Sequence, residues 1–198
     1  MKEITVYLVR HCEPELPSDH ICLGIRDIPL SLKGISHALK LKSYFSDKGI
    51  EAIYSSPLKR ARKTAEIIAD NKIRIEIKND FSEINMGKWD GMTFAEIKEK
   101  YPLEYEERGK DFENYVVEGG ESMSMCRDRA LRQLKDIMDN SEGNIIIVAH
   151  AGVNRLIISG LTGMSIKDSF LYQLKYGSII RLKYDGDISK IDNEEIHI

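Results

Sequence analysis

Two histidines and two arginines stand where strands are expected to end or helices to begin. Arg10 and His11 directly follow an apolar, β-branched run, ITVYLV, and His150 ends a second such run. Arg60 falls in the first turn of a helix that is predicted to follow a third apolar run. Because parallel strands present their carboxyl ends to one ligand-binding edge of a sheet, these four side chains are expected to meet there. Together they predict an anion site that can also perform covalent chemistry.

The chemistry of the two histidines follows from their neighbours. A lone histidine is more often structural, but a cation beside an imidazole at the end of a buried strand is costly without a role. Arginine offers planar donors that suit phosphate. Neighbouring arginines disfavour the imidazolium form, which leaves His11 a neutral ring nitrogen for use as nucleophile or base. At His150 the first N–H groups of the next helix favour an anion, and burial for packing alone is the other interpretation.

Two choices stay open on the residues alone. Arg60 shares the segment KRARK with three other cations, and the motif does not say which of them enters the pocket. Glu83 and Asp90 lie in FSEINMGKWDG, where apolar neighbours can desolvate a carboxyl group enough to make it a general acid. Many surface loops have a similar composition.

The elements that must position these residues alternate between strand and helix patterns. Ser31 and Ser56 are predicted helix caps, and the residues after 184 are expected to form a turn and a tail. The alternation predicts a three-layer α/β/α sandwich with a mainly parallel sheet and an antiparallel edge strand, built as one domain over residues 1–198. Strands are expected at 3–9, 50–54, 74–78, 144–148 and 177–184, and helices at 31–48, 57–69, 93–100, 102–109, 122–140 and 152–161.

Two other motifs suggest different chemistry and are set aside. The segment from Cys126 to Arg132 has the C-x5-R spacing of cysteine-dependent phosphatases. It lacks glycine, carries several charges and continues a helical pattern, so we expect a helix there rather than a phosphate loop. His11, Cys12, His20 and Cys22 match no common zinc spacing, and we expect no metal site.

Composition limits the function classes. The 198 residues are 42% hydrophobic and 31% charged, with a net charge of −3. This balance gives no reason to expect binding to nucleic acid or to a membrane. Three cysteines fit a reducing compartment better than a disulfide framework, and neither a signal peptide nor a membrane span is evident. We therefore expect a cytoplasmic protein.

Taken in order, the motifs resemble those of the histidine phosphatase superfamily, which has the phosphoglycerate-mutase-like fold. LVRHCE at 8–13 looks like the family signature LVRHGE, and the later blocks cover essentially the whole chain. The resemblance implies that His11 accepts the phosphoryl group and that Arg10, Arg60 and His150 form the phosphate pocket. It also implies that Glu83 protonates the leaving group and then activates water, with no metal or other cofactor. The matching later blocks are DIPLSLKG, YSSPLKRARKTA, SEINMGKWDG, GGES and VAHAGV.

The sequence departs from the family pattern at Cys12, Pro14, Pro17 and His37, and the first and third of these bear on the chemistry. Cys12 replaces the usual glycine, and its thiol would make activity sensitive to oxidation if it were exposed. Pro17 stands where many members have an asparagine that touches phosphate, which puts that contact in doubt.

The resemblance implies a phosphomonoesterase that acts through phosphohistidine on a small phosphorylated metabolite, with α-ribazole 5'-phosphate of cobalamin synthesis as the named candidate. A cofactor-dependent phosphoglycerate mutase and a non-catalytic module that binds a phosphorylated ligand are the alternatives. Substrate selectivity is expected to lie in the irregular region 81–118. The oligomeric state stays open, with a homodimer among the alternatives.

Overall fold

A mixed β-sheet forms the centre of the fold. The computed structural model describes residues 3–16, 21–185 and 192–196. Within these ranges the sheet has six strands in the order β3-β2-β4-β1-β5-β6. The first four in that order are parallel, whereas β5 is antiparallel to β1 and β6 is antiparallel to β5. The strands are β1 (Ile4–Arg10), β2 (Ile50–Ser55), β3 (Arg74–Ile77), β4 (Asn144–Ala149), β5 (Ile179–Tyr184) and β6 (Asp192–Ile196).

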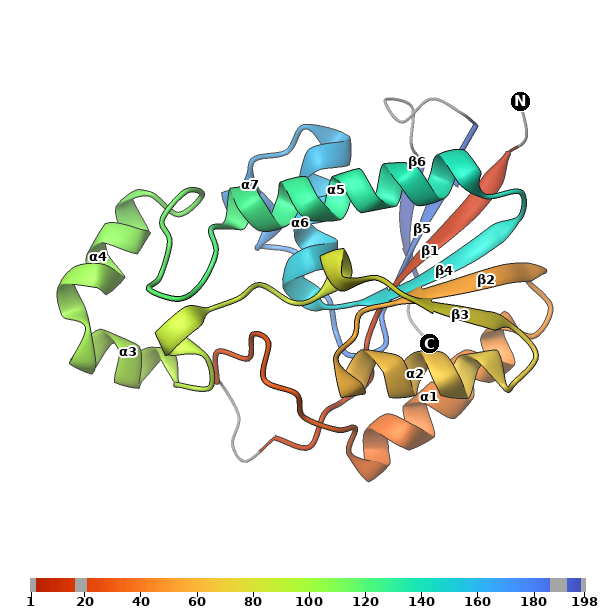
Figure 1. The fold of residues 1–198 in the computed structure, drawn as a ribbon, viewed down its shortest axis with the longest axis horizontal. Helices are drawn as coiled ribbons and strands as arrows, with labels where there is room; N and C mark the ends of the chain where they lie inside the picture. The colour runs from red at the N-terminus through yellow and green to blue at the C-terminus, as the bar shows by residue number, and fades with distance from the viewer. Residues whose placement is uncertain (1–2, 17–20, 186–191, 197–198) are drawn as a thin grey trace.

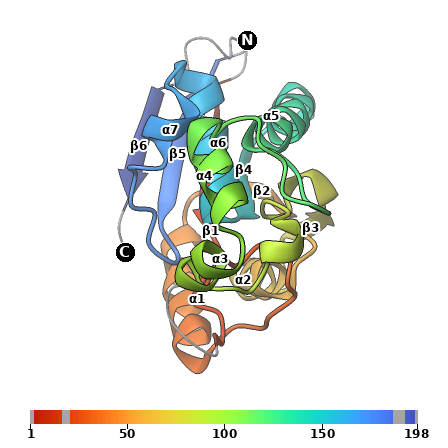
Figure 2. The same cartoon turned by 90° about the vertical axis from the view of Figure 1, so that its left-hand side faces the viewer.

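Helices cover both faces of the sheet. α1 (Leu32–Phe45) and α2 (Lys59–Ala69) pack on one face, and α5 (Met123–Asn140) and α6 (Ala151–Thr162) on the other (Figure 1, Figure 2). Along β1, Val6 and Leu8 belong to the core under α5 and α6, and Tyr7 and Val9 to the core under α1 and α2. This alternation follows from the two-residue period of a strand with both faces buried. The predicted three-layer sandwich with a mainly parallel sheet and an antiparallel edge is confirmed.

The region between β3 and α5 lies on the side of the sheet where the parallel strands end (Figure 1). Its two predicted short helices are confirmed as α3 (Phe94–Lys100) and α4 (Pro102–Lys110), accompanied by the 3-10 turns η1 (Asn79–Phe81) and η2 (Gly87–Trp89). Thr93 starts α3 through a reciprocal capping box with Glu96. Trp89 is fully buried and stacks on Tyr115. Trp89 and Ile97 belong to the same apolar core as Val6 and Leu8, so this region is packed onto the edge of the sheet.

The C-x5-R segment is helical, as expected. It lies within α5, and Cys126 is fully buried in the core. Burial raises the pKa of its thiol well above the ordinary value, so the group stays protonated and unreactive. None of the helices in the described ranges is both long enough and apolar enough to cross a membrane.

Three predictions about the elements were wrong. α1 ends at Phe45 rather than Lys48. The residues expected to form a tail contain β6, which pairs antiparallel with β5 although its sequence, DNEEI, lacks the apolar alternation of a predicted strand. Ser56 does not cap α2, which begins at Lys59 after Leu58 and has no side-chain cap. The hydroxyl of Ser56 bonds His150 instead. The short helix α7 (Ile166–Ser169) was also not predicted.

Candidate active site

The structure brings all five predicted site residues to one edge of the sheet. β1 and β4 are adjacent, and their register pairs Arg10 with Ala149, so His11 and His150 lie side by side. Their ring centroids are 5.0 Å apart. Arg60 reaches them from the first turn of α2, and Glu83 reaches the same edge from the irregular segment between η1 and η2. No helical or strand period predicts this last approach, because the segment is irregular.

The hydrogen bonds of His11 determine which of its nitrogens is free to react. Nδ1 lies 2.7 Å from the carbonyl oxygen of Cys12, which only accepts, so Nδ1 carries the ring proton. Nε2 accepts a hydrogen bond from Nε of Arg60 at 3.3 Å and therefore keeps its lone pair. Burial, with Arg60 and then Arg10 nearby, holds the pKa of His11 well below the ordinary value of 6.5. His11 is thus a neutral imidazole with Nε2 as the available nucleophile.

The hydrogen bonds of His150 assign it the same tautomer as His11. Its Nε2 lies 2.7 Å from the hydroxyl of Ser56, whose oxygen also accepts the N–H of Leu58 at 3.3 Å. Among the described contacts, Nε2 is the only acceptor for the Ser56 hydroxyl proton, so the proton of His150 is assigned to Nδ1. Burial, followed by the charge of Arg60, holds the pKa of His150 well below 6.5. The role of Ser56 was missed, because its place before Pro57 is typical of a helix cap.

Arg60 and Arg10 differ in how many of their N–H donors have partners within the protein. Arg60 is the cation of its segment that enters the core: it is fully buried and donates Nη1 to the carbonyl of Arg26 and Nη2 to that of Gly24, each at 2.7 Å. Lys59, Arg62 and Lys63 are not buried. Arg10 donates Nη1 to the carbonyl of Leu174 at 2.5 Å and stacks on Tyr176, with 3.9 Å from its guanidinium carbon to the ring centre.

Two buried donors stay unpaired beside His11. Among the described residues, neither Nε of Arg10 nor Nδ1 of His150 has a hydrogen-bond partner. A buried donor left unpaired costs about 1–3 kcal/mol. Two such donors flanking a neutral nucleophile suit an oxyanion that would pair with both.

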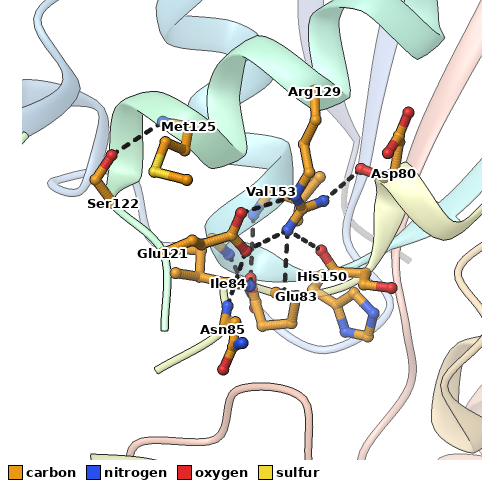
Figure 3. Close-up of polar contacts among 12 residues, drawn as sticks. Asp80, Glu83, Ile84, Asn85, Glu121, Ser122, Met125, Arg129, His150 and Val153 are labelled. Carbon is orange, nitrogen blue, oxygen red and sulfur yellow. Dashed lines mark hydrogen bonds and ion pairs between the residues drawn. The ribbon is translucent and has the colours of Figure 1, made fainter. Parts of the chain in front are cut away.

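Glu83 occupies the start of α6. Its Oε2 accepts the N–H of Gly152 at 3.2 Å, and its Oε1 accepts those of Val153 at 3.3 Å and Ile84 at 3.0 Å (Figure 3). A side chain at Gly152 would put its Cβ 2.5 Å from Oε1, so the glycine is needed for this approach. The helix start is therefore occupied by the Glu83 carboxyl group, which oriented N–H groups hold.

Asp90, the other candidate carboxylate, has a different position. It accepts the backbone N–H groups of Gly24 at 2.8 Å and Arg26 at 3.0 Å. These two residues also supply the carbonyls that bind Arg60. Asp90 therefore orders the loop behind Arg60 and does not lie among the residues that line the pocket.

A pocket of about 440 Å³ opens in front of His11. Its lining includes Arg10, His11 and Glu83, together with two arginines that no sequence pattern had singled out, Arg108 and Arg155. Arg108 lies over Phe112 and Arg155 over Phe170, and these two aromatic rings contact each other edge to face at 5.2 Å. The apolar part of the lining comprises Leu16, Ile21, Leu23, Ile84, Met86, Phe94, Met123, Phe170 and Tyr176.

The structure describes one of the two departures that bear on the chemistry, Cys12, and not the other, Pro17. Cys12 is fully buried, and burial raises its pKa to about 12. The condition for oxidation sensitivity, an exposed thiol, is not met. The backbone N–H of Cys12 bonds Thr64, whose hydroxyl bonds the carbonyl of Arg60, so the position joins the nucleophile to α2. Pro17 lies outside the described residues, as does His20.

We expect both imidazoles to stay neutral well below pH 6.5. Ring-nitrogen chemical shifts, assigned with His11→Gln and His150→Gln, should show a single proton, on Nδ1, in both rings at pH values below 6.5, where an ordinary imidazole takes up a second proton. The unfolded rings take up protons as the pH falls through 6.5 and the folded rings do not. The free energy of unfolding should therefore fall below pH 6.5 and gain nothing from these groups above it. A ring that titrates near 6.5 in the folded protein would contradict this electrostatic picture.

Comparison with known proteins gives the chain its family. The profile described as "Histidine phosphatase superfamily (branch 1)" matches residues 6–195. Phosphoserine phosphatase 1 of Hydrogenobacter thermophilus is 32% identical over 165 residues, 82% of this chain and 78% of the relative. A candidate phosphoglycerate mutase of Escherichia coli, GpmB, is 30% identical over 96% of this chain and 95% of its own. The crystal structure of a candidate α-ribazole-5'-P phosphatase from Escherichia coli shares the fold, with a TM-score of 0.87 at 21% identity over 96% of this chain and 94% of its own. The chain belongs to the histidine phosphatase superfamily.

Proposed function

We propose that the protein is a phosphomonoester hydrolase that acts through a phosphohistidine intermediate on a small phosphorylated metabolite. One observation carries the proposal: Nε2 of His11 keeps its lone pair in a buried cationic setting, between unpaired donors of Arg10 and His150. Membership in a superfamily of phosphatases supports the same reaction class.

The proposed first step transfers the phosphoryl group to the enzyme. Nε2 of His11 attacks phosphorus, the bond from phosphorus to the ester oxygen breaks, and Glu83 gives its proton to that oxygen. The N–H groups of Gly152 and Val153 stabilise the charge that develops on Glu83. Arg10 and His150 donate hydrogen bonds to the phosphoryl oxygens, and Arg60 keeps the nucleophilic imidazole neutral.

The proposed second step returns the enzyme to its starting state. Glu83 takes a proton from water, the resulting hydroxide oxygen bonds to phosphorus, and the bond from phosphorus to Nε2 breaks. Inorganic phosphate leaves and His11 is neutral again. The covalent intermediate divides one difficult displacement into two easier ones.

The pocket lining supports two classes of substrate. Its apolar side chains suit a flat organic group such as the base of α-ribazole 5'-phosphate. Arg108 and Arg155 suit a second anionic group, as in phosphoserine, and neither forms an ion pair with a carboxylate in the described part of the chain. Turnover of a panel containing both compounds distinguishes the two classes.

We also propose that the enzyme acts in the cytoplasm, as its three free, buried cysteines suggest.

Replacing the nucleophile should abolish turnover. His11→Ala removes the group that is proposed to accept the phosphoryl, so we expect no measurable phosphate release from any substrate. Wild-type enzyme quenched during turnover should carry acid-labile, base-stable phosphate, which peptide mapping places on His11. Cys126→Ala should retain this label, because Cys126 lies in the core of α5.

Substantial activity in His11→Ala, or a label on a cysteine, would overturn the covalent mechanism. Enzyme treated with EDTA should keep its turnover, because the family resemblance implies no metal. A strict requirement for added metal would contradict the proposed set of residues.

Replacing the proton donor should affect substrates according to their leaving groups. Glu83→Gln should slow an alkyl phosphate by ~10²–10⁴-fold and p-nitrophenyl phosphate far less, since p-nitrophenolate leaves without a proton. Asp90→Asn, in the same region, should change both substrates by the same factor because Asp90 only orders a loop. Equal losses on both substrates in Glu83→Gln would mean that Glu83 positions groups rather than transferring a proton.

The GpmB relative keeps a mutase as the second candidate function, and the fate of the phosphoryl group decides between them. A mutase must retain a bisphosphorylated intermediate in a closed cationic site. Residues 81–118 contain ten acidic and five basic side chains, which disfavours such a polyanion. We therefore expect release of phosphate from 3-phosphoglycerate with little isomerisation and no stimulation by 2,3-bisphosphoglycerate. Isomerisation faster than phosphate release, followed by NMR, would assign the protein as a mutase.

A further inference from the structure

Arg129 on α5 binds the backbone on the N-terminal side of Glu83. Its guanidinium donates to the carbonyls of Asp80, Ser82 at 2.9 Å and Glu83 at 3.3 Å (Figure 3). Its side chain is 18% exposed. These carbonyls belong to a segment that leaves η1 and has no ladder of its own, so they need side-chain partners. One planar group with five donors meets that need.

Glu121 binds the backbone on the C-terminal side of Glu83. Its carboxylate accepts two hydrogen bonds from Arg129, at 2.7 and 2.9 Å, and a third from the backbone N–H of Asn85 at 2.9 Å. Its own N–H donates to the carbonyl of Asn85 at 2.9 Å. The Arg129–Glu121 pair thus binds the chain both before and after Glu83.

The Glu83 side chain points away from this pair to the start of α6. Its carboxylate lies within 3.2 and 3.3 Å of the N–H groups of Gly152 and Val153, in a space that leaves no room for a Cβ at Gly152. A small shift of the backbone would therefore move the carboxylate off these donors. General acid catalysis needs the donor within hydrogen-bond reach of the leaving oxygen, so the position of the backbone matters for the proton transfer.

We infer that the Arg129–Glu121 ion pair positions Glu83 for proton transfer to the leaving group. Neither residue lines the pocket, so both act through Glu83 and are positioning residues. The inference rests on the proposed function, in which Glu83 is the proton donor.

The test compares leaving groups in Arg129→Gln. This variant should lower kcat on an alkyl phosphate by about tenfold or more, a share of the ~10²–10⁴-fold that a general acid contributes. It should change kcat on p-nitrophenyl phosphate by less than about threefold, since that leaving group needs no proton. KM for both substrates should stay close to wild type, because Arg129 does not touch the pocket. Arg127→Gln removes an arginine of the same helix whose ion pair, in the part of the chain that the structure describes, is with its neighbour Asp128, and it should match wild type on both substrates.

A double-mutant cycle with Glu83→Gln gives the second measurement. Once Glu83 can no longer give a proton, Arg129→Gln should cause no further loss on the alkyl phosphate. If Arg129→Gln fails to fold, Arg129→Lys and Glu121→Gln provide the same comparison, since each breaks the paired hydrogen bonds and keeps most of the side chain's volume.

Each outcome decides the inference. Equal losses on both substrates, or a loss on the alkyl phosphate that persists in the Glu83→Gln background, would overturn it and leave Arg129 a purely structural residue. If Glu83→Gln discriminates between the substrates and Arg129→Gln does not, this inference fails and the proposed function stands. If Glu83→Gln itself does not discriminate, the role proposed for Glu83 fails first.

Discussion

The buried contact between Arg60 and His11 is the interaction on which the site depends. A fully buried guanidinium is costly, and within the described ranges no carboxylate forms an ion pair with Arg60. Its partners are the carbonyls of Gly24 and Arg26 and the ring nitrogen of His11. Since this nitrogen must accept the hydrogen bond, a proton on it would break the contact and add a second buried charge. The same cation therefore orders a loop, orients the imidazole and keeps it neutral.

The remaining donors at this edge are left for a ligand. With Arg60 paired to carbonyls, the open positions are Nε of Arg10 and Nδ1 of His150. Ser56 sets the second of these, because its hydroxyl proton fixes the tautomer of His150. An anion that pairs with both donors makes hydrogen bonds that no described protein group supplies, which gives the pocket a preference for oxyanions before any contact with the organic part of a substrate.

Three carboxylate side chains near this cationic centre accept hydrogen bonds from backbone N–H groups. Asp90 holds the loop that supplies carbonyls to Arg60, Glu121 holds Asn85, and Glu83 itself lies on the N–H groups at the start of α6. Among the contacts described, none of the three carboxylates forms an ion pair with Arg10 or Arg60. The positive charges of Arg10 and Arg60 are therefore available to a bound substrate. The carboxylates order the irregular segments that surround the site.

The sequence by itself determined five of the six strands of the described sheet, most helices and the places of Arg10, His11, Arg60 and His150, because these depend on local periodicity and on where a buried strand ends. It also indicated that the C-x5-R segment is a helix. Only the tertiary structure decided which cation of KRARK is buried, since its acceptors Arg26 and Gly24 lie 34 and 36 residues earlier in the chain.

Large sequence separation also explains why the choice between Glu83 and Asp90, the hydrogen bond of Ser56 and the contacts of Arg129 were not predicted. Ser56 and His150 are 94 residues apart, and Arg129 and Glu83 are 46 apart. Hydrogen bonds over such separations leave no period in the sequence. Local patterns therefore determined where the reactive side chains stand, and long-range hydrogen bonds decided their protons, their partners and which carboxylate reaches the site.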